Sequence, residues 1–256
     1  MPDLAHLVLF VVLGGVLGAL GGLFGIGGGL LAIPVLGIFF HLDQQHAQGT
    51  SLVMVVPNVM VGLWDYARRG SVDRRVAILL GVCAVSFTFA GALYATRIAG
   101  PGLRYEFGAF TAALAIYFTY RALHDANRRA SGEHPRPRLQ WGWTALVGAL
   151  GGVLSGLFSV GGAVFAVPFL SLLFGYTQTE AQGLSLALVA PGTIVGIVTY
   201  ALAGDVDWWI GIPLALGGTF CVRFGVALAH RLPERTLRLF FCVLLAAASV
   251  ALFVKT

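Results

Sequence analysis

A run of glycines inside a long apolar stretch is the strongest constraint on how this chain can fold. Six of the nine residues from Gly21 to Gly29 are glycine, and the surrounding stretch from Leu4 to Phe40 is almost free of charge. Each glycine in a helix interior costs about 1 kcal/mol relative to alanine, so a helix is expected to break here. Irregular backbone at membrane depth is tolerated only where protein or a water-filled cavity covers its peptide groups. The run therefore predicts a broken helix that presents bare backbone inside a membrane protein.

The composition supports a membrane protein and argues against the main alternatives. The chain is 58% hydrophobic and 11% charged, whereas soluble domains carry about 25% charged residues. Several apolar runs exceed the roughly 18 residues that span a bilayer, so we expect an all-α, polytopic integral membrane protein in contact with lipid. The net charge of +5 comes from arginines between apolar runs, where the positive-inside rule expects them, so no nucleic-acid partner is predicted.

No catalytic, metal or cofactor motif stands out in the sequence. There is no P-loop, no complete dinucleotide fingerprint and no histidine or cysteine spacing typical of a metal site. The three cysteines lie in apolar segments and are expected to be small apolar packing residues. We therefore expect a protein that is not an enzyme and that needs neither a metal nor a cofactor.

The glycine run occurs twice, and the second copy reveals an internal repeat. Residues 154–170 repeat residues 20–36 at an offset of 134 positions, and residues 181–186 repeat residues 47–52 at the same offset. Further identical pairs continue along the chain without a gap: Pro57 and Pro191, Gly62 and Gly196, Tyr66 and Tyr200, Asp73 and Asp207, Gly91 and Gly225.

The repeat divides the chain into two membrane repeats, residues 1–123 and 141–256, joined by a cytoplasmic linker at 124–140. Each repeat holds four apolar blocks, of which the first is broken by glycine. The blocks are expected at 4–40, 47–64, 76–96 and 105–123, and again at 143–174, 181–203, 208–229 and 236–254.

The distribution of basic residues favours repeats that are inverted relative to each other. If each repeat crosses the membrane an odd number of times, twelve basic residues face the cytoplasm and three face outward. Parallel repeats would give ten and five, which satisfies the positive-inside rule less well. We therefore expect two homologous inverted repeats, with both termini and the 203–209 loop outside and the linker inside.

The doubled motif carries a family resemblance. Gly-Leu-Phe-Gly-Ile-Gly-Gly-Gly at 22–29, the following Pro34, and Ala-Gln-Gly-Thr-Ser-Leu at 47–52, all repeated in the second half, resemble the sulfite exporter TauE/SafE family, also called the toluene sulfonate uptake permease family. The resemblance covers essentially the whole chain. It implies a multi-pass carrier of the bacterial-type inner membrane for sulfur-containing anions such as sulfite or organosulfonates, without implying uptake or export. The second copy departs from the motif at Ser155, Ser159, Ala163 and Leu184, so the two half-sites are not expected to be equivalent.

The glycine turns are the first candidate binding element. Helix N-termini carry partial positive charge and free amides, and carriers with inverted repeats aim such termini at anionic substrates near the midplane. With the second short helices expected to begin at Leu30 and Val164, the predicted backbone donors are Gly27, Gly28, Gly29, Gly161 and Gly162, with Ser159 beside them. The alternative is that these glycines only allow close helix packing, which is what we expect of Gly14, Gly15 and Gly18.

Polar side chains at the start of apolar spans are the second candidate element. They can donate hydrogen bonds to a substrate without a buried charge, although helix capping and contacts between helices are an equal alternative. These predicted binding residues are Gln48, Thr50, Ser51, Gln182 and Ser185. Asn58 is a further predicted binding residue that falls in the middle of a span beside Pro57, where lining a pore and capping the proline break are equal alternatives.

Arg223 is a third candidate, because it is the only basic residue well inside an apolar block and has Phe89 as its repeat partner. It could supply the counter-charge for one anion. The alternative is a side chain that snorkels to the membrane interface. Asp65 and Glu180, at block edges, are expected to be solvated rather than proton carriers.

Together these features predict a secondary transporter that moves a small anion by alternating access at a site between the repeats. Coupling to protons or Na⁺ and the oligomeric state stay open. The alternative is a passive anion channel, since glycine-rich broken helices serve a pore equally well. Saturable counterflow would identify a carrier, and unitary currents would identify a channel.

Overall fold

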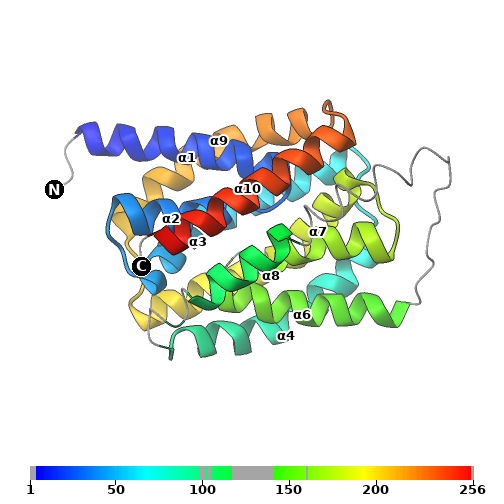
Figure 1. Cartoon of the computed structure of the whole chain (residues 1–256), viewed down its shortest axis with the longest axis horizontal. Helices are drawn as coiled ribbons and strands as arrows, with labels where there is room; N and C mark the ends of the chain where they lie inside the picture. Colours follow the sequence, from blue (N-terminus) through cyan, green and yellow to red (C-terminus); the bar gives the residue numbers. More distant parts are fainter. Residues whose placement is uncertain (1–3, 99–101, 103–104, 117–140, 160, 255–256) are drawn as a thin grey trace.

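The structure is a computed structural model that describes residues 4–98, 102, 105–116, 141–159 and 161–254. The linker 124–140 lies outside these residues. Every regular element in the described part of the chain is an α-helix. The helices are α1 Leu4–Phe24, α2 Gly29–Phe39, α3 Gln44–Arg68, α4 Arg74–Ala95, a helix at Tyr105–Ile116, α6 Trp141–Phe158, α7 Gly161–Leu173, α8 Gln178–Ala203, α9 Trp208–Ala229 and α10 Glu234–Val254 (Figure 1).

Both glycine-rich blocks break where the sequence predicts. The first block divides into α1 and α2 around residues 25–28, and the second divides into α6 and α7 around residue 159. α2 begins one residue before Leu30, but α7 begins three residues before Val164. The second turn is therefore shorter, because Gly161 and Gly162 take helical conformations whereas Gly27 and Gly28 have positive φ.

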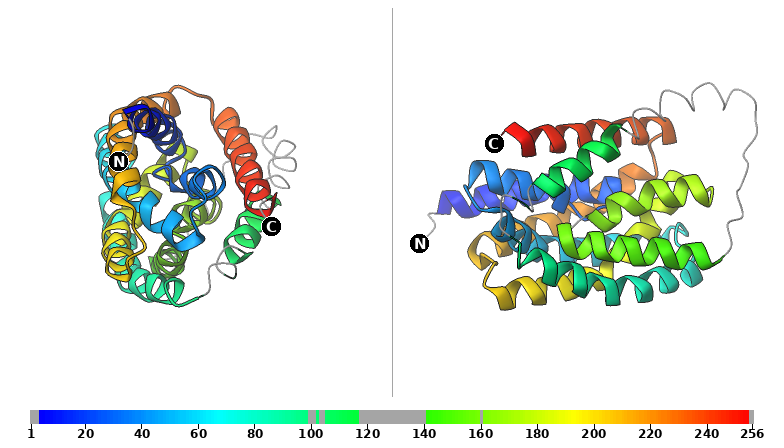
Figure 2. Two further views of the ribbon diagram at one scale, coloured as in Figure 1. Left: turned by 90° about the vertical axis from the view of Figure 1, so that its left-hand side faces the viewer. Right: turned by 60° about the horizontal axis from the view of Figure 1, so that its bottom comes forward.

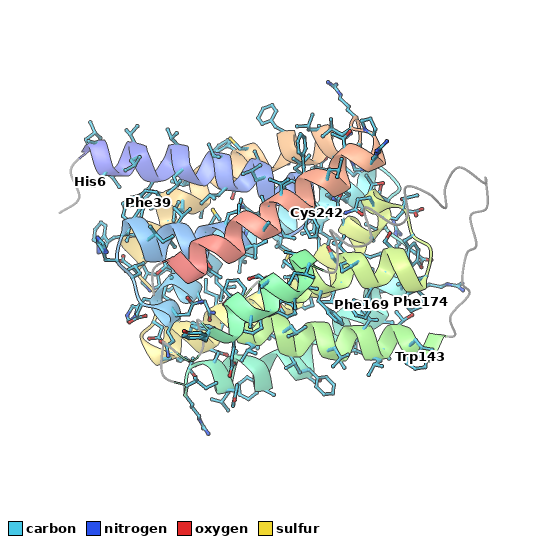
Figure 3. All side chains as sticks on the ribbon, in the orientation of Figure 1. His6, Phe39, Trp143, Phe169, Phe174 and Cys242 are labelled. Carbon is cyan, nitrogen blue, oxygen red and sulfur yellow. The ribbon has the colours of Figure 1, made fainter. Side chains whose placement is uncertain are left out.

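The outer surface has the apolar character of a lipid-facing protein. Helices α1, α3, α4, α8 and α9 are each long and apolar enough to cross a membrane. Large apolar side chains are exposed along them, for example Phe220 at 77% on α9, and Phe39 and Trp143 also point outward (Figure 3). Trp208 and Trp209 are exposed at the start of α9, a position typical of tryptophans at the membrane–water interface. The chain is a polytopic membrane protein.

Helices α3 and α8 pack against each other in the interior and run antiparallel. The hydroxyl of Tyr66, near the end of α3, contacts Gln182 near the start of α8. The hydroxyl of Tyr200, near the end of α8, contacts Gln48 near the start of α3. Each helix continues through an internal proline, Pro57 or Pro191, even though proline lacks the amide that would bond to the preceding turn.

Two seams of small residues bring other helices into close contact. On α1, a β-carbon at Gly14, Gly18 or Gly22 would collide with the backbone of α9. The sequence prediction that Gly14 and Gly18 are packing residues is confirmed, and Gly15 lies against Cys221 of α9. An equivalent seam joins α6 to α4 and uses Gly148, Gly152 and Gly156. Glycine or small residues every fourth position let two helix backbones approach closely within a membrane.

These contacts sort most of the helices into two bundles. The first consists of α1, α2, α3 and α9, and the second of α4, α6, α7 and α8. Each bundle therefore contains three helices from one half of the chain and one from the other. The bundles meet along α3 and α8. Helix α10 and the helix Tyr105–Ile116 lie beside each other on one outer side of the molecule (Figure 2).

Candidate functional site

The turn between α1 and α2 is held by side chains from two other helices. Gly25, Gly27 and Gly28 have φ of 67°, 71° and 95°, a region that glycine enters at no steric cost. The Nδ2 of Asn58 on α3 donates to the carbonyl of Gly27 at 3.2 Å, and the Oγ of Ser185 on α8 donates to the carbonyl of Gly25 at 2.9 Å. The carbonyl groups of the turn are thus engaged by protein donors.

The amides that follow this turn have no such partner. Among the described residues, no acceptor bonds to the backbone N–H groups of Gly28, Gly29 or Leu30, as expected in the first turn of a helix without a side-chain cap. β-Carbons added at Gly27 and Gly28 would lie 2.6 Å from Val59 and 2.7 Å from the carbonyl of Leu17. These two glycines therefore serve close packing as well as leaving amide donors at the start of α2.

The turn between α6 and α7 repeats part of this geometry with a serine. Ser159 has φ of 59°, close to that of its repeat partner Gly25, which is rare for a residue with a side chain. Its Oγ is buried and lies beside the Tyr200 hydroxyl, without a hydrogen bond of standard geometry among the described residues. Gly161 and Gly162 form the first turn of α7, where backbone amides again lack partners within the helix.

Gln182 forms one buried polar half-site with Tyr66. The Tyr66 hydroxyl lies 3.0 Å from both the Gln182 Oε1 and the Gly22 carbonyl, and Gln182 packs directly against Gly25. The side chain of Gln182 is fully buried, yet its Nε2 has no acceptor in the described part of the chain. This half-site presents an unused hydrogen-bond donor beside the first glycine turn.

Gln48 forms the equivalent half-site with Tyr200. The Tyr200 hydroxyl donates to Gln48 Oε1, and the Gln48 Nε2 is again fully buried without an acceptor among the described residues. Eighteen residues of α3 separate Gln48 from Tyr66, which places the two half-sites about 27 Å apart along the helix axis at 1.5 Å per residue. The predicted residues therefore form two sites towards opposite ends of the α3–α8 interface rather than one central cluster.

Three other predicted polar residues have contacts that explain them structurally. Thr50 Oγ1 accepts from the backbone N–H of Asp207 at 2.9 Å and fastens the start of α9 to α3. Ser51 donates to the carbonyl of Gln48. Asn58, besides its bond to Gly27, contacts Thr219 of α9. Their positions favour the alternative role of contacts within and between helices.

Arg223 differs from the half-site glutamines in being exposed, whereas Gln48 and Gln182 are fully buried. Its side chain is exposed on α9, and its guanidinium lies 5.0 Å from the ring of Trp64 on α3. Arg68 stacks on the same ring at 3.8 Å. This arrangement corresponds to the snorkelling alternative, in which the apolar part of the side chain covers an aromatic residue near the interface.

The interior of the described structure is mainly apolar, and the polar side chains buried within it are uncharged. Besides Tyr66 and Tyr200, the buried polar side chains there are glutamines, serines, threonines and one asparagine, with no buried carboxylate, lysine, arginine or histidine among the described residues. Nor does that part of the chain hold a group of three residues able to ligate a metal ion. What the interior offers to a ligand is therefore hydrogen-bond donation without a fixed charge.

Sequence reasoning missed four residues of this interior. Tyr66 and Tyr200 complete the half-sites, and Gln44 and Gln178 are two further buried glutamines whose Nε2 has no partner among the described residues. Each pair is related by the same offset of 134 positions that selected Gln48 and Gln182. The sequence signal that could have identified them is that each residue type recurs at the matching position of the other repeat.

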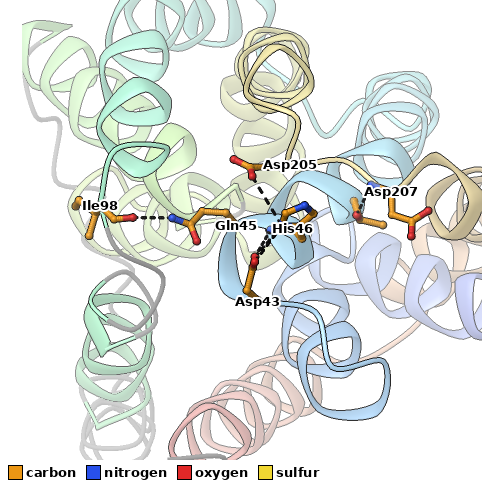
Figure 4. A network of polar contacts seen from close by, with 7 residues as sticks. Asp43, Gln45, His46, Ile98, Asp205 and Asp207 are labelled. Atoms are coloured by element: carbon orange, nitrogen blue, oxygen red, sulfur yellow. Dashed lines mark hydrogen bonds and ion pairs between the residues drawn. The ribbon is translucent and has the colours of Figure 1, made fainter.

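A polar network closes the end of the molecule at which α3 begins (Figure 4). His46 Nδ1 lies 3.0 Å from Asp43 Oδ1 and 3.8 Å from Asp205 Oδ1 in the loop before α9. Gln45 donates to the carbonyl of Ile98 at 2.6 Å. Burial raises the pKa of Asp205 above its ordinary value of 3.8, Asp43 raises it further, and His46 opposes the shift.

The fold and its interior define a class: a polytopic membrane protein with paired broken helices and buried donor groups, as in transporters. A model of the family described as sulfite exporter TauE/SafE matches residues 10–252, and the chain belongs to this family. It is thus a probable membrane transporter rather than an enzyme.

Curated relatives agree with this assignment at low identity. The chain is 26% identical over 219 residues to a probable membrane transporter protein of Methanocaldococcus jannaschii, covering 81% of this chain and 79% of the relative. It is 24% identical over 248 residues to the probable membrane transporter protein YunE of Bacillus subtilis, covering 90% and 91%. A probable membrane transporter protein of Xylella fastidiosa is 29% identical over 221 residues, covering 86% and 83%. No solved structure matches the chain significantly.

Proposed function

We propose that this protein is a secondary transporter that moves sulfur-containing oxyanions, sulfite or organosulfonates, across the bacterial-type inner membrane by alternating access at a site between two inverted repeats. The observation that carries the proposal is the pair of buried Nε2 donors of Gln48 and Gln182, both without an acceptor among the described residues. A buried donor left unpaired costs about 1–3 kcal/mol. A ligand that supplies acceptor oxygens at these positions removes that cost.

The chemistry of the donors favours an oxyanion. The amides of Gln48 and Gln182, the hydroxyl of Ser159 and the first-turn amides of α2 all donate. A sulfite or sulfonate group has three oxygens that only accept. Helix N-termini add partial positive charge, so a single negative charge can be bound without a buried cation. The description of the family as sulfite exporters supports sulfur as the central atom.

The antiparallel course of α3 and α8 supports inverted repeats, because these helices occupy equivalent places in the two halves. A second contact adds to this support. Ser71 Oγ, in the loop after α3, lies 2.9 Å from Nε2 of His230 at the end of α9, so both loops lie at one end of the molecule. Parallel repeats would have put them on opposite faces. The basic residues of both loops then gather at one end, which the positive-inside rule assigns to the cytoplasm.

Alternating access would occur as a relative movement of the two bundles along the α3–α8 interface. The glycine seams hold α1 to α9 and α6 to α4, so each bundle would move as a rigid body. Gln48 and Gln182 lie at the interface between the bundles, where such a movement would expose one half-site at a time. The competing function is a passive anion channel, in which both half-sites are open together.

The test is transport by purified protein in liposomes. Radiolabelled sulfite and a small organosulfonate are offered with and without unlabelled anion trapped inside. We expect saturable uptake that is accelerated by trapped anion, which is counterflow. Uptake that does not saturate, together with unitary currents in planar bilayers, would instead establish the channel.

Variants of Gln48 and Gln182 in the same assay test whether these glutamines bind the anion. Gln48→Glu and Gln182→Glu keep the size of the side chain and the acceptor for the tyrosine, but replace the donor by a negatively charged carboxylate. We expect each to reduce sulfite counterflow at least tenfold, about 1.4 kcal/mol or more. Gln45→Glu is the matched control, because Gln45 neighbours the site in sequence but bonds to the Ile98 carbonyl. Equal activity of all three variants would remove the glutamines from the site.

A further inference from the structure

Four glutamines share one property in the described interior: a side-chain amide that is at least nine-tenths buried and whose Nε2 has no hydrogen-bond partner. Besides Gln48 and Gln182, they include Gln44, 7% exposed, and Gln178, 2% exposed. Gln44 and Gln178 are repeat partners at the offset of 134 positions. The unpaired donors therefore form two equivalent pairs, one on α3 and one on α8.

Within each pair the two glutamines lie one above the other. Gln44 and Gln48, and likewise Gln178 and Gln182, are four residues apart, so their side chains share one helix face and are separated by about 6 Å along the axis. Gln44 and Gln178 are the first residues of their helices. Because α3 and α8 run antiparallel, one pair lies towards each end of the interface, with Gln44 or Gln178 as its outermost member.

Helix capping does not account for the outer glutamines. The cap of α3 is the side chain of Asp43, which accepts from the N–H of His46. The cap of α8 is Thr177 in a capping box with Glu180. Both helix starts are therefore satisfied without a glutamine amide. Replacing an unpaired buried donor by an apolar group of similar shape is near neutral or stabilising, so stability alone gives no reason for a glutamine at either position.

We propose that Gln44 and Gln178 are the outer donors of two anion-docking positions, one at each end of the route, at which an oxyanion is held jointly with Gln48 or with Gln182. This inference rests on the proposed function and adds a second, outer donor to each of its two half-sites. A sulfite or sulfonate group presents several oxygens and can accept from both amides of a pair at once.

The experiment measures transport from each side of the membrane separately. Gln44→Met and Gln178→Met remove the donor with little change in size, and protein orientation in the liposomes is determined by cleavage of a terminal tag. We expect the KM for sulfite presented at the end that carries the substitution to rise about tenfold. The KM at the other end should stay unchanged. The ratio Vmax/KM should fall equally in both directions, as microscopic reversibility requires of an uncoupled carrier.

Control variants distinguish a failure of the docking positions from a failure of the proposed transport function. Gln45→Met and Thr179→Met stand one residue away from each outer glutamine and should leave both KM values unchanged. If a methionine variant does not fold, Gln44→Glu or Gln178→Glu keeps the polar shape and should raise KM further. Unchanged KM at both ends in folded variants, with wild-type protein transporting sulfite, overturns the docking positions and leaves the transporter intact. Wild-type protein that transports no sulfur oxyanion instead overturns the proposed function.

Discussion

Tyr66, in the first half of the chain, donates its hydroxyl towards Oε1 of Gln182, in the second half, at 3.0 Å. The same relationship recurs between Tyr200 and Gln48 with the halves exchanged. In both cases the tyrosine occupies the oxygen of the amide and leaves its nitrogen unpaired. Each tyrosine therefore orients a donor that belongs to the other half.

This relationship gives the first prediction. Tyr66→Phe or Tyr200→Phe should raise the KM for sulfite several-fold, because the freed glutamine amide can rotate away from its donating orientation. A loss of about 1–2 kcal/mol in stability is also expected, since a buried acceptor loses its donor. Transport kinetics and thermal unfolding of the same preparations check both effects. Tyr94→Phe, on an exposed tyrosine, should change neither quantity, and a tyrosine variant with wild-type KM would contradict the orienting role.

The glycine seam gives the second prediction. Gly18→Ala places a methyl group against the backbone of Gly218, and Gly152→Ala places one against Ala84. Overpacking of this kind costs about 1–3 kcal/mol, so we expect a clear drop in melting temperature for both variants. Gly37→Ala is the control, because its added carbon would lie at an ordinary 3.7 Å from the Leu42 carbonyl. Melting temperatures equal to that of the control would mean that the helices of each seam can move apart without loss of stability, which would contradict the packing role of these glycines.

The third prediction concerns pH. Burial raises the pKa of Asp205 above 3.8, so the folded state binds this proton more tightly than the unfolded state. Its contribution to stability therefore improves as the pH falls through the raised pKa towards 3.8. Asp205→Asn should melt slightly above wild type at pH 7, and the difference should shrink by pH 4.5. A difference that grows on acidification would mean that the bond to His46 outweighs the cost of burial.

Arg223 provides the fourth prediction. Its exposed guanidinium lies over Trp64, whereas Gln48 and Gln182 are fully buried, so Arg223→Gln should retain near wild-type sulfite transport. Parallel measurement of Gln48→Glu, in which transport should be lost, shows that the assay detects a defective site. Abolished transport in folded Arg223→Gln protein would restore this residue as the counter-charge of the anion.

The fifth prediction is the membrane orientation. In a variant lacking Cys83, Cys221 and Cys242, single cysteines at Arg69 and at residue 130 of the linker should be labelled from the cytoplasmic side. A cysteine at Trp209 should be labelled from outside. Impermeant maleimides applied to intact cells and to inverted vesicles make the comparison. Labelling of Arg69 and Trp209 from one side would be incompatible with a molecule whose α3 end and α9 start lie at opposite faces.

Much of the fold could be predicted because its determinants are local. Apolar length predicted the spans, and the cost of glycine in a helix predicted a break in the first block of each half, ending before Leu30 and before Val164. The start of α7 was placed three residues late, because Gly161 and Gly162 adopt helical dihedrals that glycine identity alone does not reveal. Which glycines outside α1 form a seam depends on which helix packs against them. That pairing joins segments far apart in the sequence, so local sequence does not predict it.

The candidate site was predictable only in part, for a related reason. Gln48 and Gln182 were recognised from polarity within apolar blocks. The expectation that they converge did not anticipate that antiparallel packing puts them about 27 Å apart, at 1.5 Å per residue of α3. The roles of Tyr66 and Tyr200 could not be predicted, because each tyrosine contacts a glutamine in the other half of the chain. Arg223 was selected by its charge. Its exposure depends on which side of α9 packs against other helices, and the sequence of α9 alone does not reveal that.

The exchange of helices between the two bundles has a consequence for biosynthesis. Gly18 of α1 needs its partner Gly218 of α9, which is made 200 residues later. At about 5–20 residues per second, that is a delay of roughly 10–40 s. Until then the glycine side of α1 in the nascent first half has no helix packed against it and must be covered by lipid or by the insertion machinery. The finished molecule resembles a domain-swapped dimer fused into one chain, in which neither half can complete its own bundle.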